Sequence, residues 1–160
     1  ELGAHLWDAI WQAGEPLNIA PGCPNLIERI EGGLLSYGNE MTRENNPLEV
    51  GLGAFCALDG SVDYVGREAL QAIAKRGVQR KIRGVAFGGG ACPTCSKPWP
   101  VMVGEKIVGR VTSAIWSPRM EQNVGQALID RDHWTPGQNV IVHSQDGATR
   151  PGVVSALPFD

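Results

Sequence analysis

Cysteine and histidine are the residues of this chain that most often carry chemistry, and their clearest arrangement is Cys92-Pro93-Thr94-Cys95. One Cys-x-x-Cys pair supplies two of the four ligands of a structural zinc ion, and Cys23 and Cys56 show no second paired spacing. A thioredoxin-like redox pair should open a helix, which Pro98 and Pro100 prevent. We therefore expect reduced loop cysteines without a chemical role, with a metal pair and a redox pair as the alternatives.

The other chemically active residue types show no arrangement of a known site. His5, His133 and His143 are scattered, and none has a Cys, Asp or Glu partner at the spacing of a metal site or a catalytic triad. The chain also lacks a Gly-x-Ser-x-Gly motif, a phosphate-binding loop and a dinucleotide fingerprint. The residues alone therefore assign no catalytic group and no metal ligand.

The composition is that of a globular protein. Its 160 residues are enough for one ordinary domain with a core, and 42% of them are hydrophobic. A formal net charge of −3 without a basic cluster argues against binding to nucleic acid, whose phosphates require many Lys and Arg residues. Since we find no apolar run of about 18 residues and no secretory leader, we expect a cytoplasmic protein that does not bind membranes.

The first half of the chain shows helical periodicity in three segments, residues 2–13, 25–32 and 66–76. In the second of them Asn25 is a favourable N-cap, and Glu28 completes a capping box three residues later. Glycines follow all three segments, as is typical of helix ends.

The second half consists of short β-branched runs separated by glycine turns. The turns Gly104-Glu105 and Asp146-Gly147 are typical of hairpins, whereas Gly88-Gly89-Gly90 is expected to be a flexible loop. The runs predict strands at Lys81–Phe87, Val101–Val103, Lys106–Ser113, Val124–Ile129, Val140–His143 and Gly152–Leu157. We therefore predict an α+β fold, with short helices followed by a small antiparallel six-stranded β-barrel.

The order of the motifs resembles the glycine-cleavage T-protein (aminomethyltransferase) superfamily. The family's Arg-x-Glu-x-Gly, Leu-Tyr-Gly and Pro-x-Glu-x-Gly-Leu segments correspond to Arg29–Gly33, Ser36–Gly38 and Pro47–Leu52. Further matches to family motifs lie at Asp63–Leu70, Arg80–Val85, Val108–Ser113 with Ser117-Pro118, and Val153–Phe159.

This resemblance implies how the chain is organised. Family members are much longer, so the resemblance implies that this chain is the C-terminal part of a larger enzyme. Residues 1–46 would be the tail of the folate-binding catalytic domain, and residues 47–160 would be the C-terminal β-barrel domain. The implied cofactor is tetrahydrofolate, and the implied partners are a small-molecule methyl donor and the N-terminal remainder of the same enzyme.

The resemblance also implies cofactor-binding residues. In the aminomethyltransferases an arginine that contacts the folate pterin stands where Asn25 stands here, so Asn25, Arg29 and Tyr37 are the implied folate-binding residues. The residues around Asn25 are instead similar to those of the dimethylsulfoniopropionate demethylase branch. Two alternatives stay open: Asn25 is a helix cap alone, and Arg29, Glu31 and Glu49 are ion-pairing or turn-supporting groups.

The resemblance implies a function in methyl transfer. We expect part of a tetrahydrofolate-dependent demethylase that takes a methyl group from dimethylsulfoniopropionate, and we expect this part to be inactive alone. The alternatives within the enzyme class are aminomethyl transfer and folate-dependent demethylation of another N- or O-methyl substrate. The alternative outside it is a non-catalytic barrel module, with a metal at Cys92 and Cys95.

Overall fold

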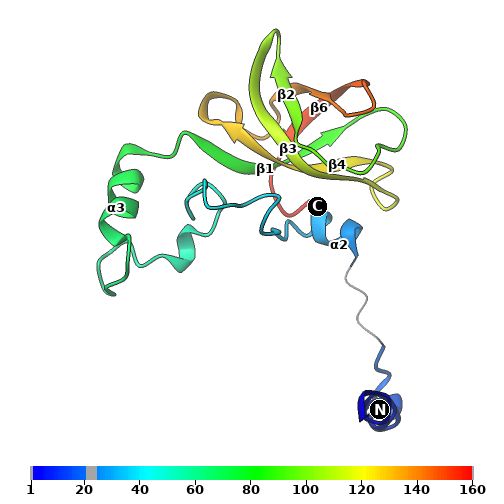
Figure 1. Cartoon of the computed structure of the whole chain (residues 1–160). Helices are drawn as coiled ribbons and strands as arrows, with labels where there is room; N and C mark the ends of the chain where they lie inside the picture. The colour runs from blue at the N-terminus through cyan, green and yellow to red at the C-terminus, as the bar shows by residue number, and fades with distance from the viewer. Residues whose placement is uncertain (1, 21–24, 160) are drawn as a thin grey trace.

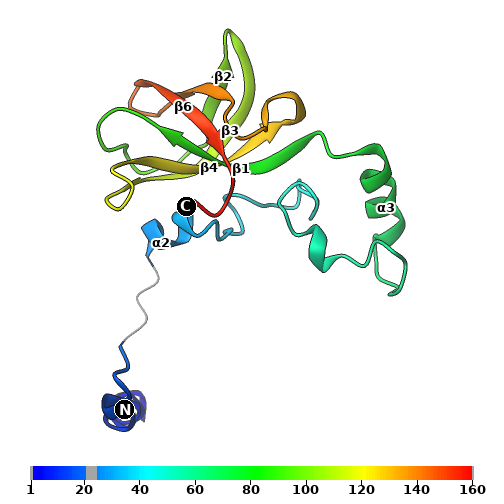
Figure 2. The same cartoon turned by 180° about the vertical axis from the view of Figure 1, so that it is seen from behind.

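The computed structural model describes residues 2–20 and 25–159, so Cys23 lies outside the described residues. Figures 1 and 2 show a barrel, a short helix beneath it beside the C-terminus, a helical arm to one side and a separate N-terminal helix. The helices are α1 (Leu2–Gly14), α2 (Leu26–Glu31) and α3 (Arg67–Arg76), with 3-10 turns η1 (Glu15–Leu17), η2 (Gly53–Phe55) and η3 (Arg131–His133). The strands are β1 (Arg80–Phe87), β2 (Trp99–Val103), β3 (Lys106–Ser117), β4 (Gln122–Asp130), β5 (Asn139–His143) and β6 (Thr149–Ser155).

The six strands form a closed antiparallel barrel in the order β1-β4-β3-β2-β5-β6, which confirms the predicted fold. β1 pairs with β4 along its whole length, but it pairs with β6 only over Gly84–Phe87. The start of β1 therefore has an edge without a strand neighbour on the β6 side. There the N–H of Ile82 donates to the C=O of Glu49 at 2.8 Å, so a loop from the first half of the chain covers part of this edge.

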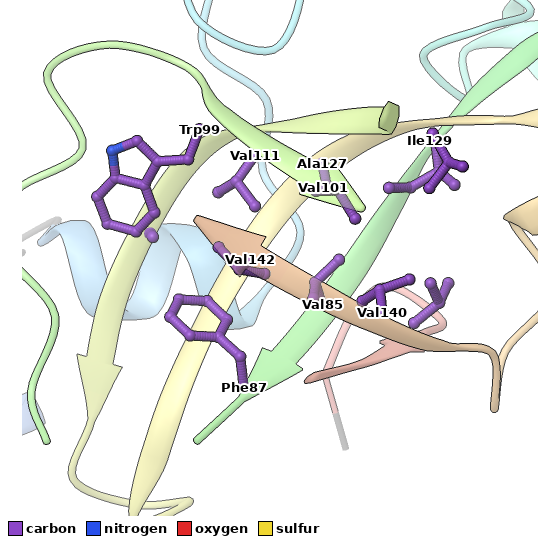
Figure 3. Packing of buried hydrophobic residues seen from close by; sticks show 12 residues of the cluster. Val85, Phe87, Trp99, Val101, Val111, Ala127, Ile129, Val140 and Val142 are labelled. Carbon is purple, nitrogen blue, oxygen red and sulfur yellow. The ribbon is translucent and has the colours of Figure 1, made fainter. Parts of the chain in front are cut away.

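The barrel is filled by side chains from all six strands (Figure 3). Phe87 and Trp99 pack edge to face, with ring centroids 6.4 Å apart. Burial of these β-branched and aromatic side chains supplies the main driving force for the fold. The cluster consists of Val85, Phe87, Trp99, Val101, Val108, Val111, Ala114, Ala127, Ile129, Val140, Val142 and Val154.

The last strand differs from the prediction. β6 ends at Ser155, whereas the sequence pattern predicts a strand that extends to Leu157. The following residues leave the barrel and pack on α2, where Phe159 and Leu157 join a small cluster around Ile30. The N–H of Phe159 donates to the C=O of Glu31 at 2.8 Å, which ties the C-terminal segment to this helix.

The Gly88–Gly90 loop, which the sequence predicts to be flexible, is hydrogen-bonded to two barrel residues. The Nδ2 of Asn123, a fully buried residue, donates to the carbonyls of all three glycines at 3.1–3.4 Å. Arg150 Nη1 adds a bond of 2.6 Å to the C=O of Gly90. The sequence does not show these bonds, because Asn123 and Arg150 lie far from the loop along the chain.

The apolar stripe predicted for the first helix is exposed on α1. Leu2, Leu6, Trp7 and Ile10 are each more than half exposed, and Figure 1 shows the helix well separated from the barrel. Within the described residues, no helix combines the length and the apolar character that a membrane crossing requires.

The close approach of β3 to β4 predicts that Gly109→Ala destabilises the barrel. A Cβ at this position would lie 2.5 Å from the C=O of Leu128 and 2.8 Å from Cδ1 of Ile129. We expect a loss of about 1–3 kcal/mol in the free energy of urea unfolding. Gly90→Ala is the control, since no atom lies within 4 Å of its added Cβ, and equal stability of the two variants would contradict the prediction.

Candidate functional site

The site with the predicted cofactor residues begins at the N-terminus of α2. Asn25 is the N-cap of this helix, and its Oδ1 accepts a hydrogen bond of 2.9 Å from the N–H of Glu28. The predicted capping role of Asn25 is therefore confirmed. The helix packs against β3 and β4 on the outside of the barrel.

Arg29 joins α2 to two other parts of the chain. Its Nη1 donates to Oε2 of Glu40 at 2.9 Å and to the C=O of Leu34 at 3.0 Å, and its Nη2 donates to Oγ of Ser113 at 2.8 Å. The side chain of Arg29 is 20% exposed, whereas that of Glu40 is 0% exposed. Arg29 is thus anchored by buried groups but still reaches the surface.

The Glu40 carboxylate is the centre of this network. Besides Arg29, it accepts a hydrogen bond from the N–H of Ser36 at 2.7 Å, and it also accepts from the hydroxyls of Ser113 and Thr112. A buried carboxylate is tolerated when a cation and several donors surround it, as they do here. Sequence reasoning missed Glu40, because nothing in its spacing from Arg29 distinguishes it from a surface acid.

Two other predicted residues form ion pairs. Glu31 accepts from Oγ of Ser117 at 2.5 Å and from Nε of Arg119 at 3.0 Å, while Glu49 pairs with Arg80 at 3.2 Å. The hydrogen bond from Ser117, assisted by Arg119, lowers the pKa of Glu31 below its usual value. The ion-pairing interpretation of Arg29, Glu31 and Glu49 is therefore confirmed.

A buried glutamine completes the contact between α2 and the barrel. Gln126 is fully buried, and its Nε2 donates to the C=O of Leu34 at 3.1 Å and of Arg29 at 3.4 Å. Its Oε1 has no hydrogen-bond partner among residues 2–20 and 25–159. The side chain therefore fixes the backbone on both sides of the α2 C-terminus.

Asn25 and Arg29 line the same cavity, which has a volume of about 510 Å³. The rest of its lining is Leu26, Glu28, Leu34 and Leu35. Tyr37 does not line this cavity, and its side chain is 68% exposed. The structure therefore brings two of the three implied cofactor residues together and leaves the third on the surface.

Cys92 and Cys95 are half-buried against the barrel core. Burial raises the pKa of the Cys92 thiol, and burial with the neighbouring Cys92 and Glu40 raises the pKa of Cys95 to about 12. The described part of the chain contains no group of three or more His, Cys, Asp or Glu side chains arranged to hold a metal ion. Both shifts favour the protonated thiol over the thiolate.

The buried network predicts that Glu40→Ala is strongly destabilising. Its loss leaves Arg29 and the N–H of Ser36 without their partner, and we expect a cost of about 3–5 kcal/mol in urea unfolding. Asp63→Ala is the control, because the ion pair of this exposed residue with Arg67 should contribute little. Similar unfolding free energies for the two variants would refute the assigned role of Glu40.

The raised thiol pKa values predict slow alkylation. At about pH 8, Cys92 and Cys95 of the folded chain should react with iodoacetamide far more slowly than in the urea-unfolded chain, since the thiolate is the reactive form. Peptide mass spectrometry would measure both rates. Equal rates would contradict the raised pKa values. Stoichiometric zinc that is lost in Cys92→Ser would show that these cysteines bind a metal.

Comparison with known proteins agrees with the predicted superfamily. The model of the glycine cleavage T-protein C-terminal barrel domain matches residues 80–160, and the GCVT N-terminal domain model matches residues 1–60. A crystal structure of glycine cleavage system aminomethyltransferase T from Bartonella henselae shares the fold, with a TM-score of 0.70 and 20% identity over 82% of this chain and 37% of that one.

Two curated relatives connect the chain to both enzyme types. It is 50% identical over 147 residues to dimethylsulfoniopropionate demethylase DmdA of Ruegeria pomeroyi, covering 92% of this chain and 40% of that protein. It is 35% identical over 159 residues to an aminomethyltransferase of Symbiobacterium thermophilum, covering 98% and 41%. The chain thus spans about 40% of the length of these relatives, and the expected resemblance to the demethylase branch is confirmed. The chain belongs to the glycine cleavage T-protein family and carries the C-terminal barrel of that family.

Proposed function

We propose that this chain is part of a tetrahydrofolate-dependent methyltransferase that demethylates dimethylsulfoniopropionate. The observation that carries the proposal is the 50% identity to a demethylase named for this substrate, over 92% of the chain. The identity to the aminomethyltransferase of Symbiobacterium is 35% over a similar length.

The chemistry fits a site without a nucleophile of its own. A sulfonium methyl group is already activated, because its leaving group is a neutral thioether. The protein has to hold this methyl group in line with N5 of the folate and exclude water, which is catalysis by proximity and orientation. The chain therefore needs to contribute only binding and positioning groups.

Asn25, Arg29 and Tyr37 are the groups of this chain that we assign to folate. Arg29 and Asn25 line one cavity, and two N–H donors of the Arg29 guanidinium have no partner among the described residues. Those donors can meet acceptors of a pterin ring. The exposed Tyr37 ring is available for stacking on a flat aromatic ligand.

The site as proposed also needs the rest of the enzyme. We assign residues 1–46 to the end of the folate-binding domain and residues 47–160 to the C-terminal domain. The exposed apolar face of α1 supports the need for a further part of the enzyme, because such a face is normally covered by a partner. The N-terminal remainder of the enzyme is the partner that we assign to it.

Aminomethyl transfer is the second candidate. It is supported by identities of 30–35% to aminomethyltransferases of several bacteria over nearly the whole chain. The two candidates share the folate and differ in the methyl or methylene donor.

An assay of the complete protein that contains this chain separates the candidates. With tetrahydrofolate, we expect turnover of dimethylsulfoniopropionate to the monomethyl thioether and 5-methyltetrahydrofolate. Dimethylglycine and an aminomethylated lipoyl carrier protein should not react. Turnover of either nitrogen substrate, with none of the sulfonium compound, would contradict the proposed methyl donor. It would not contradict the assignment of tetrahydrofolate.

Substitution of Asn25 tests the assigned folate contact. Asn25→Ala should cost about 1 kcal/mol of stability through loss of the cap, and it should also weaken tetrahydrofolate binding in the complete protein. Asn25→Ser is the matched control, because serine restores the cap without the amide. If neither variant changes the folate dissociation constant, Asn25 is a cap alone.

A further inference from the structure

A second cavity lies beside α2 and the residues that follow it (residues 26–35, the α2 segment), next to the part of β1 that does not pair with β6. Its volume is about 480 Å³, which is in the range of small-molecule sites. In Figure 2 the red C-terminal segment leaves the barrel beside β1 and ends next to α2, which places it along one wall. The cavity is lined by Gly32, Gly33, Leu34, Leu35, Met41, Val50, Gly51, Leu52, Lys81, Ile82, Arg83, Leu157 and Pro158. We call it the β1-edge cavity.

The charge of this cavity has one sign. Lys81 and Arg83 are the charged residues of the lining, which contains no Asp or Glu. Within the described ranges neither cation forms an ion pair. Most of the other lining residues are apolar.

Both cations are held by the protein itself. Arg83 Nε donates to the C=O of Trp134 at 2.9 Å, and its Nη1 donates to the C=O of Ile82 at 3.2 Å. Lys81 Nζ lies 5.9 Å from the ring centroid of the same Trp134, at the limit of a cation–π contact. The two side chains are therefore positioned without a carboxylate.

The edge of β1 explains why Arg83 reaches the cavity. In an antiparallel strand the N–H and C=O of one residue point to the same side, and the N–H of Ile82 points away from β4 towards Glu49. The C=O of Ile82, which binds Arg83, therefore lies on the open edge that borders the cavity. Three of the five N–H donors of this guanidinium have no partner among the described residues.

We propose that the β1-edge cavity binds a small organic carboxylate, with its carboxylate on Arg83 and Lys81 and its apolar body against the leucine and valine side chains. A guanidinium with free donors matches the two oxygens of a carboxylate, and such bonds are among the strong ones. The apolar walls favour an organic body over an inorganic anion. Burial also lowers the pKa of Arg83.

The sulfonium group of the proposed methyl donor does not suit this cavity. Two cations and no acid would repel a sulfonium group, so the β1-edge cavity does not suit that part of dimethylsulfoniopropionate. The inference therefore does not depend on the proposed function.

Titration of the chain with hexanoate tests the inference. Isothermal calorimetry and amide chemical shifts should show saturable binding of hexanoate that perturbs Leu35, Leu52 and Ile82. Hexan-1-ol, which has the same apolar body without the charge, should bind about tenfold more weakly or not at all. Inorganic phosphate should not compete at equal concentration.

Substitutions test whether Arg83 and Lys81 bind the hexanoate. Arg83→Gln should weaken hexanoate binding by about tenfold, and Lys81→Gln, which removes no hydrogen bond seen in the structure, should weaken it as well. Arg110→Gln is the control, because Arg110 is a partly exposed barrel arginine outside this cavity. Absence of saturable binding, equal binding of hexan-1-ol, competition by phosphate, or an equal loss in Arg110→Gln would each overturn the proposal.

Discussion

The arrangement of this chain depends on one buried ion pair, between Arg29 of α2 and Glu40 of the following loop. Its oxygens and nitrogens bind backbone and side chains of three regions: the segment after α2, the loop at Ser36, and β3 at Ser113. A carboxylate fully removed from water and a guanidinium largely removed from it stabilise the fold only in the arrangement in which these donors and acceptors meet. The pair therefore fixes where the α2 segment sits on the barrel.

Both cavities follow from that position. Leu34 and Leu35 run between them and line each one, so the 510 Å³ cavity at Asn25 and the β1-edge cavity share a wall. The first offers a partly engaged guanidinium and an amide, whereas the second offers two cations and apolar walls. A movement of the α2 segment would change both cavities together, because Leu34 and Leu35 line each of them. Gln126 and Phe159 attach this segment to the barrel and to the C-terminal residues.

Local sequence patterns predicted the helices and strands well, because turns, caps and strand-forming runs each depend on residues that are close together in the chain. The glycine turns and β-branched runs located six strands, and the Asn25 cap located α2. The sequence could not show Glu40 as the partner of Arg29, or Asn123 as the clamp of the Gly88–Gly90 loop, because these contacts join residues distant in the chain. It also could not show the β1-edge cavity, which exists because β6 pairs with only half of β1. Family resemblance supplied the folate assignment, which geometry alone would not have given.

A double-mutant cycle tests the central claim most directly, namely that Arg29 and Glu40 act as one unit. The free energy of urea unfolding would be measured for the unmodified chain, Arg29→Met, Glu40→Gln and the double variant. We predict a coupling energy of about 2 kcal/mol or more, with the double variant no less stable than the worse single variant. A coupling energy near zero, with the two single losses simply adding, would contradict the account.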